Sequence, residues 1–85
     1  MEVKQVKVKS LFFASYRDLI GTDELVVDLP EGSTVADLTS VVRARAGRER
    51  LPDVVVTAVN QEYACSEKEL RNGDEVAFIP PVAGG

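Results

Sequence analysis

The chain has 85 residues, of which 45% are hydrophobic and 28% charged, and its formal net charge is −4. This length corresponds to one small domain, and the composition is typical of a folded globular protein rather than a disordered one. One cysteine excludes an internal disulfide, and the absence of histidine excludes histidine-ligated metals and a histidine general base. We therefore expect a domain without a metal site.

The distribution of charge and hydropathy indicates where such a protein works. No apolar run approaches the length of a membrane span, and residues 1–9 alternate charge with valine instead of forming the apolar core of a signal peptide. The balance of 10 basic against 14 acidic residues disfavours contacts with phosphate groups. We expect a cytoplasmic protein that binds neither nucleic acid nor a membrane.

The first third of the chain predicts a strand, a short helix and a second strand. Residues 3–13 alternate along the chain, so one face should carry Val6, Val8, Ser10 and Phe12. The other face should carry Lys7, Lys9, Leu11 and Phe13. Ser15, with Asp18 at capping-box spacing, predicts a short helix that ends at Gly21. Residues 24–29 read as the second strand, and residues 30–32 as the turn after it.

The middle of the chain contains the clearest helix. Thr34 and Asp37 have the spacing of a capping box, and an apolar stripe follows at Val35, Leu38, Val42 and Ala46. Gly47 predicts a left-handed C-terminal cap. Since the stripe is single, one face of this helix should lie on a sheet.

The second half of the chain predicts three further strands. Residues 54–59 form a continuous apolar run that suggests a central strand, and a turn at residues 60–61 leads into a short strand around Tyr63. A helical turn is expected over residues 67–70 and a tight turn over residues 72–74. In the last strand, residues 75–79, Val76 and Phe78 face one side while Ala77 and Ile79 face the other.

This order of elements predicts an α+β domain with a mixed sheet and one main helix across one face, which is the β-grasp arrangement. A ferredoxin-like domain would need two long helices. We expect the β-grasp domain to span residues 1–79 and an extended tail to span residues 80–85.

The face of the sheet without the helix should carry exposed apolar side chains. Strand alternation places Leu11, Phe13 and Ile79 there, and Tyr63 if the register of its strand agrees. Such a surface on a small sheet is typical of a partner site, and the alternative is that loops or the short helix cover it. Elsewhere the residues suggest little chemistry. Cys65 fits a half-buried hydrophobic position better than a reactive nucleophile, and no internal constellation indicates an enzyme that is catalytic alone.

The C-terminal segment is the exception. Its prolines end the last strand and extend the backbone, and its last two residues have no side chain, so the α-carboxylate could enter a narrow tunnel. A carboxylate becomes a good acyl donor once it is adenylated. The segment reads Pro80-Pro81-Val82-Ala83-Gly84-Gly85.

Several stretches of the chain resemble the ubiquitin-like sulfur carriers, and most closely the small subunits of molybdopterin synthase (the MoaD type). The matching residues are Leu11-Phe12-Phe13-Ala14, Arg17, Leu19 to Gly21, Ala58-Val59-Asn60-Gln61 and Asn72 through Gly85. The resemblance covers nearly the whole chain, and the terminal block is its most distinctive part.

The resemblance implies a carrier cycle. A ubiquitin-activator-like enzyme would consume ATP to adenylate Gly85, a sulfur donor protein would convert the adenylate to a thiocarboxylate, and sulfur would pass to cyclic pyranopterin monophosphate in molybdenum cofactor biosynthesis. No cofactor would stay bound to the carrier itself. The large synthase subunit would hold the tail, with the complex as a heterotetramer, and would contact Phe13, Tyr63 and Ile79 together with Pro80 to Ala83. Ile79 stands where the family often has an aromatic residue.

Other functions stay open on sequence alone. Carriers for thiamine, cysteine synthesis or tRNA thiolation and ubiquitin-like protein modifiers share the Gly-Gly end, and an interaction module with an inert tail is a further alternative. The cognate acceptor, the activating enzyme, the isolated oligomeric state and any role of Cys65 are not defined by these residues.

Overall fold

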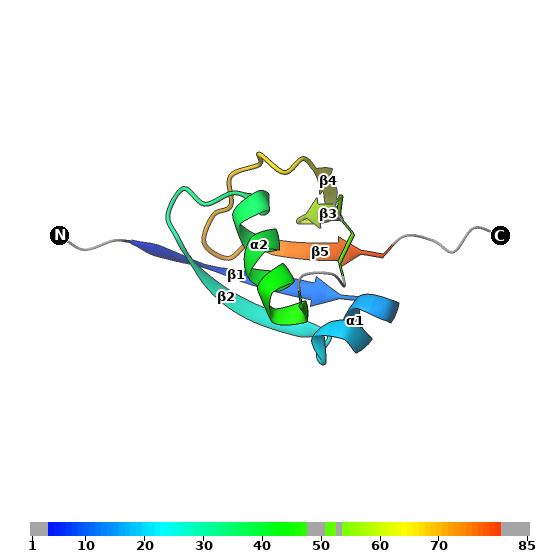
Figure 1. The fold of residues 1–85 in the computed structure, drawn as a ribbon. Coiled ribbons are helices and arrows are strands. Elements are labelled where there is room, and N and C mark those ends of the chain that lie inside the picture. Colours follow the sequence, from blue (N-terminus) through cyan, green and yellow to red (C-terminus); the bar gives the residue numbers. More distant parts are fainter. Residues whose placement is uncertain (1–3, 48–50, 53, 81–85) are drawn as a thin grey trace.

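The structure, a computed structural model, describes residues 4–47, 51, 52 and 54–80. These residues form, in chain order, β1 (Gln5–Phe12), α1 (Ala14–Ile20), β2 (Glu24–Pro30), α2 (Val35–Ala46), β3 (Val56–Val59), β4 (Glu62–Ala64) and β5 (Glu75–Ile79). The five strands make one sheet in the order β2-β1-β5-β3-β4. Strands β1 and β5 are parallel and the other pairs antiparallel. Figure 1 shows α2 crossing one face of this sheet, as the β-grasp prediction requires.

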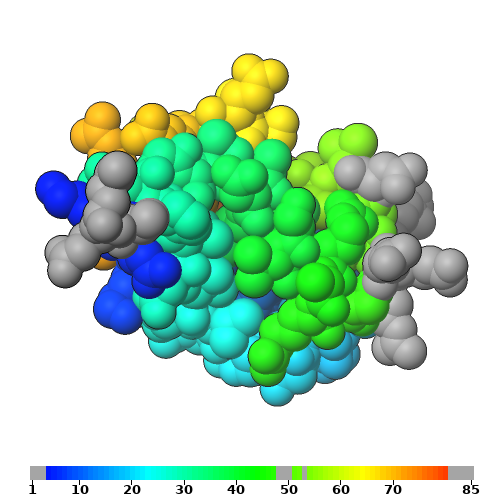
Figure 2. Space-filling model, turned by 60° about the vertical axis from the view of Figure 1, so that its left-hand side comes forward, coloured from blue at the N-terminus to red at the C-terminus, as the bar shows by residue number. Residues whose placement is uncertain are grey.

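Helix α2 begins and packs as its sequence predicts. The Thr34 backbone N–H donates to Asp37 Oδ2 at 2.9 Å, and the Asp37 N–H donates to Thr34 Oγ1 at 3.4 Å, so both halves of the capping box form. The stripe predicted for this helix is at most 8% exposed at any of its four positions, Val35, Leu38, Val42 and Ala46. In the space-filling view of Figure 2, α2 (green) lies across the face of the molecule that is turned toward the reader.

The strands bury the faces that their alternation predicts. Val6, Val8, Ser10 and Phe12 are all buried on β1, while Lys7 and Lys9 are exposed. On β5, Val76 and Phe78 are fully buried. The rings of Phe12 and Phe78 stack with their centroids 5.4 Å apart, because parallel pairing sets these two residues side by side. The core therefore lies between α2 and the sheet.

The start of α1 differs from the prediction. The helix begins at Ala14 with Phe13 as its N-cap, and Ser15 is an exposed residue inside the helix rather than a cap. Ala14 has a positive φ of 48°, and the Phe13 carbonyl accepts a hydrogen bond from the Tyr16 N–H at 3.0 Å. The chain thus turns into the helix directly after β1. The predicted end at Gly21 is confirmed, with φ 93° and ψ 5°.

Gly47 ends α2, but not in the left-handed conformation that we expected. Its φ of 94° and ψ of 132° combine a positive φ with an extended ψ, and its N–H donates to the Arg43 carbonyl at 3.0 Å. Glycine tolerates this φ because it has no Cβ. The residue type is therefore explained, although the cap geometry was predicted wrongly.

The helical turn predicted for residues 67–70 does not form. The Lys68 N–H donates to the Cys65 carbonyl at 3.1 Å, which makes a turn, and Glu69 forms a bridge with Thr34. The carbonyls of Ser66 and Lys68 accept the first N–H groups of α2 at 2.9 Å each. The first N–H groups of a helix have no partner within the helix. Their hydrogen bonds to Ser66 and Lys68 therefore hold this segment in a non-helical shape.

Strand β3 lies inside the sheet, but it is not the middle strand. It pairs with β5 on one side and with β4 on the other, and the middle position belongs to β5. The predicted turn at Asn60 and Gln61 joins β3 to β4, with φ of 50° and 73° at the two residues. The apolar run of residues 54–59 indicated an inner strand without distinguishing which one.

Two hydroxyl groups in the core, of Ser10 and Tyr16, have no hydrogen-bond partner among the described residues. Burial raises the pKa of the Tyr16 phenol from its ordinary value of 10.0, and the charge of Arg43 opposes this rise in part.

Across the described residues, no helix has the length and apolar character needed to span a membrane.

Candidate functional site

Apolar side chains gather on the open face of the sheet, opposite α2. Strand pairing aligns Leu11 with Ala77, Ala77 with Ala58, and Ala58 with Tyr63, which makes one row across four strands. A second row pairs Val56 with Ile79, and Phe13 lies one residue beyond the paired Phe12 and Phe78. We call this surface the open-face patch: Leu11, Phe13, Val56, Tyr63, Ala77 and Ile79.

The most exposed members of the patch lie at its margins. Tyr63 is 80% exposed, Phe13 50% and Val56 47%, while Leu11, Ala77 and Ile79 are partly buried between them. Phe13 has a fixed position because it lies between the end of β1 at Phe12 and the start of α1, which it caps. Exposed aromatic side chains on a rigid backbone are well suited to a protein interface.

The β1–β2 side of the open face carries charged pairs beside the exposed Val26, which is the β2 partner of Lys9. Lys7 Nζ lies 3.1 Å from Asp28 Oδ1, and Lys9 Nζ lies 3.8 Å from Glu24 Oε1, both pairs linking β1 to β2. Such exposed pairs contribute little to stability. They place charge on the half of the open face that β1 and β2 form.

The position of β5 is fixed at its start. Asn60 Oδ1 accepts from the Glu75 N–H at 3.0 Å, Asn60 Nδ2 donates to Asp74 Oδ1 at 3.0 Å, and the Asn60 N–H donates to the Glu75 carbonyl at 2.7 Å. From the other side, the Lys9 N–H donates to the Asp74 carbonyl at 2.9 Å. The register fixed here pairs Ile79, the last residue of β5, with Val56 inside the open-face patch.

The structure brings together those predicted site residues that it describes. Phe13, Tyr63 and Ile79 share the open face, and the partly buried Pro80 follows directly after β5. The remaining predicted positions, Pro81, Val82, Ala83, Gly84 and Gly85, lie outside the described residues. Sequence reasoning missed Val56, because three successive valines at positions 54–56 give no polar contrast that would assign a face.

No metal centre is found among the described residues, since no group of three or more Cys, Asp or Glu side chains is placed to hold an ion there. Cys65 is exposed, not half-buried as expected, and it lies in the turn after β4. This region of the molecule combines an exposed apolar surface with the end of the central strand β5.

Comparison with known proteins identifies the family. The model of the ThiS family matches residues 10–85. The molybdopterin synthase sulfur carrier subunit of Escherichia coli K12 is 42% identical over 83 residues, covering 92% of this chain and 99% of the relative. The corresponding subunit of Arabidopsis thaliana is 35% identical over 85 residues, covering 99% of this chain and 88% of the relative.

Solved structures agree with this assignment. A Pyrococcus furiosus protein provisionally named molybdopterin converting factor, subunit 1, is 40% identical with a TM-score of 0.76, covering 91% of this chain and 99% of that one. A chain from the complex of subunits 1 and 2 of the Helicobacter pylori molybdopterin-converting factor has the same fold, with a TM-score of 0.67 at 21% identity, 94% coverage of this chain and 100% of that one. The chain is a ubiquitin-like β-grasp protein. It belongs to the ThiS family, among the molybdopterin synthase sulfur carrier subunits.

Proposed function

We propose that this protein carries sulfur as a thiocarboxylate on Gly85 and delivers it to cyclic pyranopterin monophosphate within molybdopterin synthase. The observation that carries the proposal is the end of β5 at Ile79, in the middle of the sheet and beside the open-face patch, with a Pro-Pro-Val-Ala-Gly-Gly sequence after it. The family assignment supports a sulfur carrier over a protein modifier or an inert module.

The chemistry takes place on the terminal carboxylate. Its oxygen attacks the α-phosphorus of ATP in a ubiquitin-activator-like enzyme, and pyrophosphate leaves. Sulfur from a donor protein then displaces AMP, which produces the thiocarboxylate. The carrier has no resident cofactor in this scheme, since ATP is bound and consumed by the activating enzyme. Two terminal glycines allow the carboxylate to pass through a channel too narrow for side chains.

The open-face patch is the surface by which the carrier would bind the large synthase subunit. Phe13, Tyr63 and Ile79 lie on the same face of the sheet, and Ile79 is the last residue before the tail begins. A partner that covers the patch would therefore also receive the tail. We propose a heterotetramer of two carriers and two large subunits.

Shortening or substituting the tail tests this function. Deletion of Gly85 moves the carboxylate back by roughly 3.5 Å, one extended residue, which exceeds the tolerance of a reaction that needs atoms about 3–3.5 Å apart. Gly85→Ala keeps the reach but adds a methyl group and restricts φ. We expect charging to be nearly abolished by the deletion and strongly reduced by Gly85→Ala, with thermal unfolding unchanged in both.

The readout is intact mass after incubation with ATP, the activating enzyme and the sulfur donor. Replacement of one oxygen by sulfur in the wild-type chain, and not in the deletion variant, supports the carrier. Normal charging of the deletion variant would overturn it. Adducts on lysine side chains of other proteins, without a thiocarboxylate, would identify a modifier instead, and no ATP consumption would identify an inert module.

A further inference from the structure

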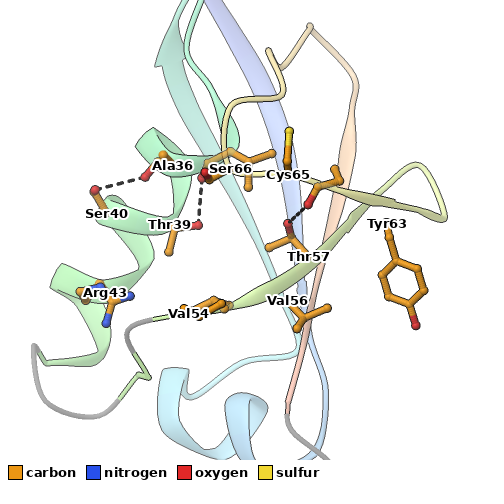
Figure 3. A pocket seen from close by; sticks show the side chains of 13 residues that line it. Ala36, Thr39, Ser40, Arg43, Val54, Val56, Thr57, Tyr63, Cys65 and Ser66 are labelled. Carbon is orange, nitrogen blue, oxygen red and sulfur yellow. Dashed lines mark hydrogen bonds between the residues drawn. The ribbon is translucent and has the colours of Figure 1, made fainter.

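A groove of about 540 Å³ lies between α2 and the beginning of β3, away from the centre of the open-face patch. Thr39, Ser40 and Arg43 of α2 lie on one side of it and residues 54–56 on the other (Figure 3). Val56 and Tyr63 also line it, so the groove borders the patch along β3. Its volume is within the range of sites that bind ligands.

The groove exists because β4 separates from β3 early. The last paired residues are Thr57 and Ala64, and the chain then turns at Cys65 to bring the Ser66 carbonyl to the Ala36 N–H of α2 at 2.9 Å. An uninterrupted hairpin would have placed Ser66 opposite Val55. The segment that pairs with the start of α2 thus leaves Val55, the residue before β3, without a neighbouring strand on that side.

The backbone of Val55 faces this opening. The Asn60 N–H donates to β5, so alternation directs the peptide groups of Ala58 and Val56 to β5 as well. Those of Val59 and Thr57 face β4. Continued to Val55, the residue before β3, the same alternation directs its peptide groups to that side. The described residues provide no backbone partner for the N–H or the carbonyl of Val55. An unpaired stretch of strand is a template for another strand.

The described residues that line the groove carry a positive charge, within an acidic protein. Arg43 is the one charged residue among the described residues that line it, whereas the whole chain carries a net charge of −4. Its Nη1 donates to the Leu51 carbonyl at 3.0 Å and its Nη2 to the Pro52 carbonyl at 2.9 Å. These bonds hold the guanidinium at the end of the groove where residues 54–56 begin, and a guanidinium has further N–H groups to donate.

We propose that this groove binds an extended segment of a partner protein by strand addition to Val55, with apolar side chains between α2 and β3 and a carboxylate at Arg43. An antiparallel strand would run from Cys65 towards Arg43, so the acidic residues would stand at its C-terminal end. Main-chain bonds supply affinity in this mode of recognition, and side-chain pockets supply specificity. The surface is separate from the terminal chemistry of the carrier.

The probe is the peptide acetyl-Val-Ile-Val-Glu-Glu-amide, compared with acetyl-Val-Ile-Val-Lys-Lys-amide, both added to the full chain labelled with ¹⁵N. We expect the acidic peptide to shift the amide resonances of Val55, Thr39 and Cys65, and to bind about fivefold more tightly than the lysine peptide at low salt. Cys65 is the only thiol in the chain. Its alkylation by iodoacetamide should slow about tenfold at a peptide concentration ten times Kd.

Matched variants locate the site. Thr39→Trp fills the groove and should abolish binding, whereas Val41→Trp, on the same helix but not among the groove residues, should not. Arg43→Gln should remove the preference for the acidic peptide, and the exposed Arg45→Gln should retain it. Circular dichroism and thermal unfolding confirm that each variant is folded before it is compared.

Four outcomes would overturn the proposal: no resonance shifts at millimolar peptide, shifts confined to the open-face patch, equal affinity for both peptides, or binding that survives Thr39→Trp. If, without peptide, the amide resonances of the groove residues shift with protein concentration, the groove binds a second copy of this chain instead. If deletion of residues 81–85 shifts the amide resonances of the groove residues, the groove binds the tail of the chain instead.

Discussion

Truncation of Tyr63 to alanine should separate binding from folding. The side chain is 80% exposed, so of the roughly 200 Å² that an aromatic residue presents, about 160 Å² is still accessible in the free domain. Full burial in an interface would contribute up to about 4 kcal/mol, and half burial about 2 kcal/mol. We therefore expect Tyr63→Ala to weaken binding of the large synthase subunit by about 30-fold to 1,000-fold.

The assay is isothermal titration of the carrier into the large subunit, beside urea unfolding of the free carrier. The unfolding free energy of Tyr63→Ala should be nearly unchanged, because little of the side chain is buried. Phe12→Ala is the matched control, since Phe12 is 1% exposed and stacks on Phe78. That change should destabilise the domain by about 3–5 kcal/mol. An unchanged Kd for folded Tyr63→Ala would refute the assignment of the patch to this interface.

Two further substitutions test the account of the fold. Tyr16→Phe removes a buried hydroxyl without a partner among the described residues, so we expect it to raise the unfolding free energy at pH 7 by about 1 kcal/mol. Burial raises the pKa of Tyr16 in the native state above its ordinary value of 10.0. The unfolding free energy of the wild type should therefore fall as pH rises from 10.0 through the native pKa. Tyr16→Phe should not show this fall when unfolding is measured against pH. Thr34→Ala breaks the capping box and should cost about 1 kcal/mol by urea unfolding. The exposed Ser40→Ala, measured in the same way, should cost much less, and equal losses would contradict the role of the cap.

Local patterns predicted those parts of the fold that local physics determines. The capping box of Thr34 and Asp37 involves residues three positions apart, and the buried stripe of α2 follows from helical periodicity. Alternation in β1 and β5 likewise placed Phe13 and Ile79 on the open face without knowledge of the pairing. The greater part of the open-face patch was therefore predictable from the two-residue period of the side chains alone.

The errors arose where a distant partner decides the conformation. The segment after Cys65 has the composition of a helical turn, but the unpaired N–H groups at the start of α2 hold it in another shape. Ser15 has the type and spacing of a cap, yet the entry from β1 starts the helix before it. The groove at Val55 could not be predicted for the same reason, since it depends on where β4 leaves β3.

The central position of β5 also determines how the domain responds to mechanical force. A pull on the C-terminal end is transmitted along β5, which is bonded to β1 on one side and to β3 on the other. Its hydrogen bonds are perpendicular or slanted to this direction, so the ladders are loaded together in shear rather than opened one bond at a time. Under the proposed function, an enzyme that pulls on the end of the carrier would therefore leave the sheet behind it in its folded shape.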